Sequence, residues 1–148
     1  MKNIIPIETT PVFKTSIERL HERTKQWVSE IKFIKIEQDF LKELLSEHIM
    51  GLCVNDKFKI GKLLLNGIEH EYKLGDELII SIKDHRMNLA LLMENIYLKK
   101  EDDFRKNHEL LKNEVKNYIQ NFKYIKEQVF ELVLVIMKKE KEKKLLHS

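Results

Sequence analysis

The sequence predicts an all-α protein, an elongated antiparallel bundle of three long, coiled-coil-like helices. Both prolines lie within the first eleven residues and all four glycines lie between positions 51 and 75, so two long stretches contain no helix breaker. In those stretches apolar residues recur at alternating spacings of three and four, which is typical of helices that pack along one seam. The length of 148 residues suits a single domain spanning 1–148, and short connections would make neighbouring helices antiparallel.

The first helix is predicted from Ser16, a good N-cap residue, to Met50, just before the helix-stop residue Gly51. Two heptad series form its seam, with polar interruptions. The first series is Ile17, Thr24, Ile31, Gln38 and Leu45, and the second is Leu20, Trp27, Ile34, Leu41 and His48.

The last helix is predicted to begin at Glu101-Asp102-Asp103, because acidic residues stabilise a helix N-terminus. Its heptads are stricter than those of the first helix. They are Phe104, Leu111, Tyr118, Ile125 and Leu132, together with His108, Val115, Phe122, Val129 and Ile136. The sequence then passes into a charged C-terminal end, 138–148, which is expected to be solvated and frayed.

A third helix is predicted from about Asp76, as a cap, to Lys100, and the segment 56–74 before it is ambiguous. Asn66-Gly67 with flanking alternation favours a β-hairpin. Apolar residues four apart, such as Ile60 and Leu64, favour a helix. A lone hairpin without a sheet is only marginally stable, so the favoured interpretation is a helical segment that continues, with or without a kink, into the third helix.

The composition restricts the kinds of partner and the cellular compartment that are expected for this protein. A net charge of +3 does not by itself imply a nucleic-acid partner. The single cysteine, Cys53, cannot form an intrachain disulfide. Residues 1–15 resemble no signal peptide and are expected to form an extended N-terminal arm. The longest apolar stretch, 129–137, is about half of a membrane span and contains Glu131. The expected protein is cytoplasmic, with neither membrane nor nucleic acid as partner.

The predicted apolar surface exceeds what one seam requires. A second apolar row, Phe33, Phe40 and Leu44, lies beside the seam of the first helix, and the last helix is apolar almost all round at 133–137. Soluble monomers rarely leave a large apolar patch open. Either the segment 56–74 covers this surface or another chain does, so the partner is expected to be the chain itself, as a homo-oligomer, or another protein.

One carboxylate, Glu37, falls within the apolar face of the first helix. Counting along an antiparallel bundle places His85 and Glu114 at a similar height, so these three residues are candidates for a buried polar layer. A bundle can also bind metal or a small ligand through inward Glu and His, which is the alternative function. However, only Glu18-Arg19-Leu20-His21 fits the Glu-x-x-His pattern, where a di-iron bundle needs two. The favoured interpretation is therefore a structural layer, or partial exposure of Glu37 at the rim of the face, with no metal and no cofactor.

Catalytic motifs are not evident. The chain has no glycine-rich phosphate loop, no Cys-x-x-Cys and no His-Glu-x-x-His. The sequence therefore predicts a non-enzymatic helical-bundle protein that acts by self-association or by binding another protein.

Overall fold

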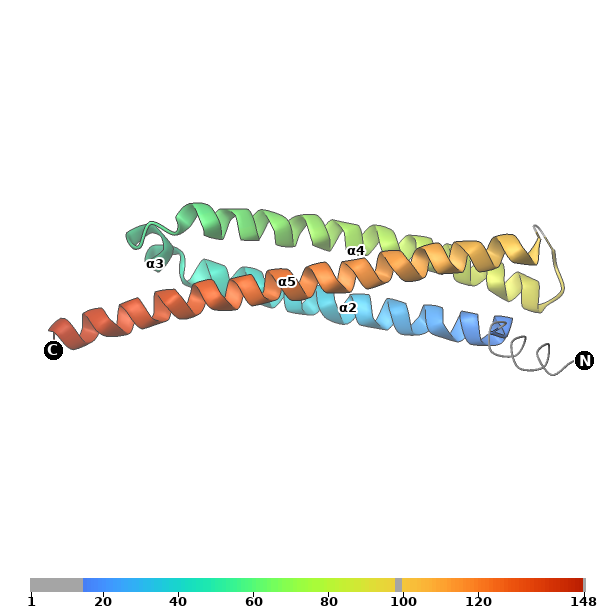
Figure 1. Ribbon diagram of the computed structural model, residues 1–148, viewed down its shortest axis with the longest axis horizontal. Coiled ribbons are helices and arrows are strands. Elements are labelled where there is room, and N and C mark those ends of the chain that lie inside the picture. Colours follow the sequence, from blue (N-terminus) through green and yellow to red (C-terminus); the bar gives the residue numbers. More distant parts are fainter. Residues whose placement is uncertain (1–14, 98–99, 148) are drawn as a thin grey trace, which may run out of the picture.

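The computed structural model describes residues 15–97 and 100–147, which form four helices and contain no strand (Figure 1). The helices are α2 (Ile17–Glu47), α3 (Ile49–Val54), α4 (Phe58–Met93) and α5 (Glu101–His147). The prediction of an all-α bundle is confirmed. The three long helices contain 31, 36 and 47 residues, which corresponds to lengths of about 46, 54 and 70 Å. Of the predicted N-terminal arm, residues 1–14 lie outside the described part of the chain.

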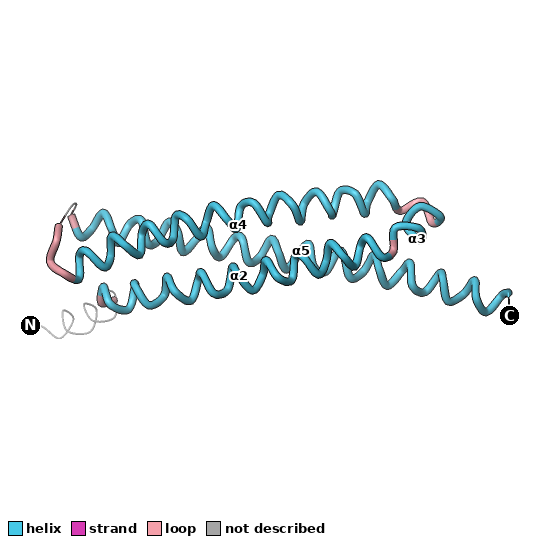
Figure 2. Tube along the Cα trace, turned by 180° about the vertical axis from the view of Figure 1, so that it is seen from behind, coloured by secondary structure: helices cyan, strands magenta, loops and turns pink. Residues whose placement is uncertain are grey.

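The three long helices lie side by side along the bundle (Figures 1 and 2). The helices α2 and α4 are antiparallel, because residue numbers fall along α4 as they rise along α2. Lys35 forms a hydrogen bond with Asp76, and further along α2 Lys42 Nζ lies 3.8 Å from Glu69 Oε1. The helices α4 and α5 are also antiparallel, because His85 contacts His108 whereas Gly75, earlier in α4, contacts Tyr118, later in α5. The helices α2 and α5 therefore run in the same direction.

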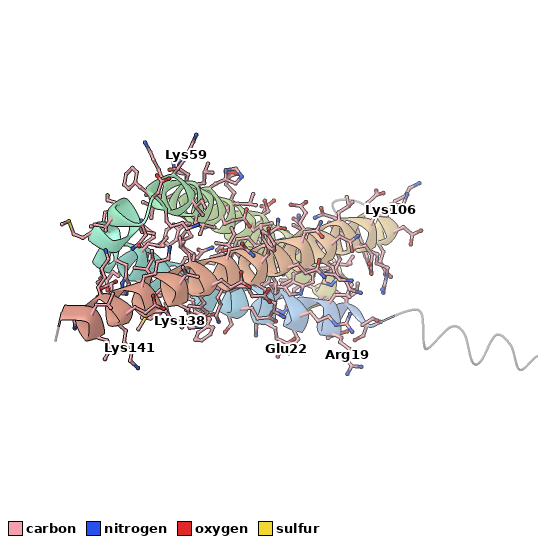
Figure 3. The ribbon with its side chains drawn as sticks, turned by 60° about the vertical axis from the view of Figure 1, so that its left-hand side comes forward. Arg19, Glu22, Lys59, Lys106, Lys138 and Lys141 are labelled. Carbon is pink, nitrogen blue, oxygen red and sulfur yellow. The ribbon has the colours of Figure 1, made fainter. Side chains whose placement is uncertain are left out.

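The predicted heptad seams form the core. Ser16 caps α2 as expected, because its Oγ accepts a hydrogen bond from the Arg19 N–H at 3.2 Å. Side chains from α2, α4 and α5 form the main apolar cluster, and those that are almost fully buried include Ile31, Leu41, Ile68, Ile82, Tyr118, Val129 and Ile136. Charged side chains project away from this cluster, as the labelled residues in Figure 3 illustrate.

The ambiguous segment 56–74 is helical, so the favoured interpretation is correct and the hairpin is wrong. Asn66-Gly67 lies inside α4, which begins at Phe58 rather than at the predicted cap, Asp76. The reason lies in packing, because the buried positions of α4 continue without a break from Gly61 through Ile68 to Leu92. As a helix, this stripe is buried against α2 and α5. A hairpin would have found no sheet to join.

The first helix ends earlier than predicted. It stops at Glu47, and Gly51 lies inside α3, which is a separate short helix. A Cβ at position 51 would collide with Ile136 Cγ2 of α5. The glycine therefore permits close helix packing and does not terminate a helix. The turn into α4 instead contains Asp56, which has a φ of 56°.

Two other predicted boundaries also differ. The helix predicted to reach Lys100 ends at Met93, and Asn95 follows with a φ of 62°. Asn adopts this left-handed conformation more easily than most residues, which explains a turn at this point. The charged C-terminal end is exposed as expected, but it is helical through His147, so α5 extends beyond the α3 end of the bundle (Figure 1).

Candidate functional site

Glu37 lies at the edge of the core, on the side of α2 that faces α5. Its side chain is 27% exposed, and its Oε2 accepts a hydrogen bond from Lys126 Nζ at 2.6 Å. The carboxylate is therefore neither fully buried nor unpaired. Its partner is a lysine of α5, which the sequence analysis did not identify.

The predicted layer of Glu37, His85 and Glu114 does not form. His85 is buried, but it contacts α5 through His108 and Asn107, and Glu114 is exposed. The error follows from the start of α4. Since α4 begins at Phe58, His85 lies 27 residues, or about 40 Å, from the turn. Glu37 lies only ten residues before the end of α2, or about 15 Å from the same turn.

A different polar layer occupies the middle of the bundle, and we call it the central layer. It consists of Gln38 from α2, Glu71 from α4 and Tyr118 from α5, which are 0%, 6% and 1% exposed. Tyr118 reaches into it because position 75 is glycine, where a Cβ would lie 2.5 Å from the Tyr118 hydroxyl oxygen. Glu71 lies one helical turn before Gly75, so both face the same neighbours.

The central layer leaves much of its hydrogen-bonding capacity unused. Among the described residues, Gln38 Nε2 and Oε1, Glu71 Oε1 and the Tyr118 hydroxyl have no hydrogen-bond partner. Burial raises the pKa of Glu71, and nearby His70 opposes the shift. Burial also raises the pKa of Tyr118 to about 12, while Gln38 lowers it and Glu71 raises it further. Both groups are therefore held toward their neutral forms.

The second buried polar group, which we call the histidine layer, lies nearer the α4–α5 turn. His85 Nε2 lies 3.0 Å from His108 Nδ1, and Asn107 Nδ2 lies 3.1 Å from His85 Nδ1. The His108 ring also packs against Trp27 with a centroid distance of 4.6 Å. Burial lowers the pKa of His85. Burial, and then the charge of His85, lowers the pKa of His108 to about 4.

The histidine layer is poorly suited to a metal ion. Within residues 15–97 and 100–147, no group of three or more His, Cys, Asp or Glu side chains is placed to hold one. The charges of Arg23, Lys112 and Arg105 also contribute to the lowered pKa of His108. A positive potential that disfavours a proton disfavours a metal cation for the same reason.

The surface between α2 and α5 is hollowed along part of its length. Two adjoining cavities of about 200 and 340 Å³ share Glu30, Ile119 and Lys123 in their linings. Phe33 lines the first cavity, and Trp27 lines the second. The rim is acidic on α2, at Glu30, and basic on α5, where it is formed by Lys112, Lys116 and Lys123.

Large apolar side chains continue this surface toward the α3 end. Phe40 follows Phe33 by one heptad, and Phe130 and Met137 follow Lys123 by one and two heptads, so they share its side of each helix. We call this surface the open face. Its large apolar side chains, with their exposed fractions, are Phe33 (62%), Phe40 (57%), Phe130 (39%), Leu134 (54%) and Met137 (50%).

A smaller apolar pocket lies at the corner where α2, α3 and α4 meet. Its volume is about 190 Å³, and it is lined mainly by Leu45, Ile49, Leu52, Phe58 and Leu65. Gly61 allows Leu52 to pack closely there, because a Cβ at position 61 would lie 2.9 Å from Leu52 Cδ1. Its lining also contains two polar residues, Ser46 and Lys62.

Some members of the two layers could be predicted from the sequence as buried residues, and others could not. His108, Tyr118 and Gln38 were recognised as seam positions but were not assembled into layers, because helix register could not be read from the sequence. Glu71 was missed, since it lies in the segment whose structure was ambiguous. Its signal was its spacing of three and four residues from Ile68 and Gly75, which are buried on the same face.

Comparison with protein-family models, with curated proteins and with solved structures finds no match to this chain. In the described residues, no helix has an apolar stretch long enough to cross a bilayer. The fold and the surfaces therefore define the chain as an elongated α-helical bundle with two buried polar layers and one apolar open face.

Proposed function

We propose that this protein is a non-enzymatic helical-bundle protein that binds protein helices on its open face, either those of a second copy or those of another protein. The observation that carries the proposal is the set of five exposed apolar side chains on adjoining sides of α2 and α5. A contiguous apolar patch rimmed by charge is typical of a protein interaction surface. An amphipathic helix is a suitable occupant, because apolar side chains spaced by heptads on parallel helices accept a third helix in the groove.

The apolar stretch 133–137 of α5, which the sequence predicted to need a covering surface, is partly buried and partly exposed. Within 133–137, Val133 and Ile136 are buried, whereas Leu134, Val135 and Met137 are exposed. Packing within the chain therefore accounts for only part of that apolar stretch. Val135 lines a cavity with residues of α4, whereas Leu134 and Met137 belong to the open face, which supports one docking surface shared by α2 and α5.

The proposed setting is the cytoplasm. Cys53 is free and exposed, which suits a compartment that keeps thiols reduced. A nucleic-acid partner is not proposed, because 27 basic residues are nearly balanced by 24 acidic ones. Neither buried layer presents an accessible nucleophile or base, which supports a binding role.

Site-specific photocrosslinking in the native cell tests the proposal. A photoreactive phenylalanine analogue replaces Phe33 or Leu134 on the open face. In matched controls it replaces Ile80 or Met87 of α4, which are 69% and 65% exposed. Crosslinks to protein are expected from the open-face positions and not from the controls. Equal yields from both sets, or none from the open face, would refute the proposal.

A further inference from the structure

We infer that the open face binds a second copy of this chain, in a parallel dimer whose two-fold axis runs along the helices. This inference rests on the proposed function, because it names the partner of the same surface. In such a dimer, α2 and α5 of both copies are the four helices that surround a shared core. Symmetric pairing of two helices from each chain is a common way to complete a four-helix bundle.

The rims of the open face carry opposite charges, which favours self-pairing. Glu30 lies on the α2 rim, and Lys112, Lys116 and Lys123 lie on the α5 rim. None of these four side chains forms an ion pair with another described residue. The nearby Glu37 is already paired with Lys126. The face therefore presents uncompensated charge of both signs, in separate strips, to whatever docks on it.

Only one symmetric arrangement matches these strips. A two-fold axis parallel to the helices places α2 of one copy against α5 of the other, at the same height along the bundle. Glu30 then faces the lysine rim of the partner subunit. A two-fold axis perpendicular to the helices places α2 against α2 and α5 against α5 in opposite directions, so Glu30 no longer faces the lysines on α5 of the other copy. Complementary charge across an interface selects the first arrangement.

The apolar part of the face fits the same arrangement. Glu37 pairs with Lys126 within one chain, so Phe40 and Phe130 lie at about the same height along the bundle. Phe40 of one copy therefore lies opposite Phe130 of the other, with Leu134 and Met137 on the following turns of α5 and Phe33 beside the lysine rim. All five side chains leave solvent together, and their burial is the main source of affinity. The charged rims supply register and orientation.

Sedimentation equilibrium at tens of micromolar tests whether the face pairs with itself. The unaltered chain is expected to be a dimer. Phe40→Asp on the face should raise the dissociation constant at least tenfold, because it places a carboxylate against Phe130 of the partner subunit. Ile80→Asp, at a similarly exposed position on α4, should leave it unchanged. A monomeric unaltered chain would overturn the inference.

A charge-reversal pair tests the role of the rims. Glu30→Lys makes both rims basic, and Lys116→Glu makes the α5 rim more acidic. Each variant alone should dimerise about tenfold more weakly, because like charges then face each other at two symmetric positions. An equimolar mixture of the two variants should recover most of the original association, since positions 30 and 116 again carry opposite charges at both contacts between the copies. Failure of the mixture to recover would contradict pairing through these rims.

Spin-label distances test the orientation. The native Cys53 carries one label at the α3 end, and Cys53→Ser/Glu94→Cys carries one at the opposite end, where Glu94 caps α4. In a parallel dimer both positions should give distances between copies within about 40 Å, the width of two adjacent bundles. In an antiparallel dimer centred on the open face, the distance between the Glu94→Cys labels should be about 50 Å or more, because this end of the bundle lies far from the middle of the face. The Cys53 labels lie near the face and should be close in either arrangement. A long distance at the Glu94 position would overturn the parallel arrangement.

These outcomes separate the inference from the proposed function. If the chain is monomeric but Phe33 crosslinks to a different protein in the cell, the inference is wrong and the proposed function stands. If neither self-association nor any crosslink from the open face occurs, both are wrong. A dimer that Phe40→Asp leaves intact would place the contact between copies on another surface and refute the inference.

Discussion

The central layer and the histidine layer are both buried among the same three helices, but they satisfy their polar groups very differently. In the histidine layer, His85 contacts both His108 and Asn107, and only His108 Nε2 is left without a partner among the described residues. In the central layer, four polar atoms from three side chains have none. An unpaired buried polar group costs free energy. The histidine layer is thus expected to favour folding at neutral pH, and the central layer to specify packing at some cost in stability.

Acid should affect the histidine layer most. Burial holds the pKa of His108 at about 4 in the folded protein, below the usual value of 6.5 in the unfolded chain. The unfolded state therefore binds more protons between these values, and stability is fully present above pH 6.5. It should fall by roughly 3 kcal/mol as the pH drops toward 4, with His85 acting in the same direction. Urea denaturation at pH 7 and pH 4 measures this loss.

The double variant His85→Leu/His108→Leu is the control for the acid effect. It removes both titrating groups and fills the layer with apolar side chains. Its stability should therefore change much less over the same pH range. An unchanged acid loss in the double variant would show that other groups are responsible.

Gly75→Ala should disrupt the central layer by about 1–3 kcal/mol, which is typical of overpacking. The added Cβ would lie 2.5 Å from the Tyr118 hydroxyl oxygen and 3.1 Å from Cζ. In a Tyr118→Phe background the oxygen is absent, and alanine is also the better helix former. The loss should then shrink below about 1 kcal/mol. A double-mutant cycle by urea denaturation gives the coupling, and additive effects would refute the contact.

Glu71→Gln should stabilise the protein at neutral pH by on the order of 1 kcal/mol, because it removes a buried carboxylate that lacks a full set of partners. Burial raises the folded pKa of Glu71 above its usual value of 4.5. Its contribution to stability is therefore present below the unfolded pKa and is lost as the pH rises through the folded pKa. The advantage of glutamine should consequently vanish under acid conditions. Urea denaturation of both proteins at pH 4 and pH 7.5 tests this, and equal gains at both would argue against titration of Glu71.

The smallest effect is expected at the edge of the core. The ion pair of Glu37 with Lys126 is partly exposed, so its coupling energy should be below about 1 kcal/mol. The coupling of Glu37 with His85, two members of the polar layer that the sequence predicted, should be near zero because these residues have other partners. Double-mutant cycles on both pairs measure the difference. A larger value for Glu37 with His85 would contradict the register of the bundle.

The sequence by itself determined that the chain is helical and which faces of the first and last helices are buried. The heptads of the first and last helices predicted which side chains are buried, including Gln38, His108 and Tyr118, because helix periodicity is a local property. The N-cap at Ser16 was equally local. Glycine was harder to interpret, since Gly51 and Gly75 serve close approaches between helices rather than turns, and such approaches exist only once the helices are packed.

Only the tertiary structure decided which buried residues meet. The register between helices depends on where each turn falls, and moving the start of α4 from Asp76 to Phe58 shifts its partners by 18 residues, or about 27 Å. That shift separates Glu37 from His85 and brings Glu71 to the central layer. The open face likewise results from packing, because the three helices bury Phe122 and Ile136 and leave Phe33 and Phe40 exposed. Periodicity fixes the faces of single helices, but the length of every preceding helix fixes which faces come together.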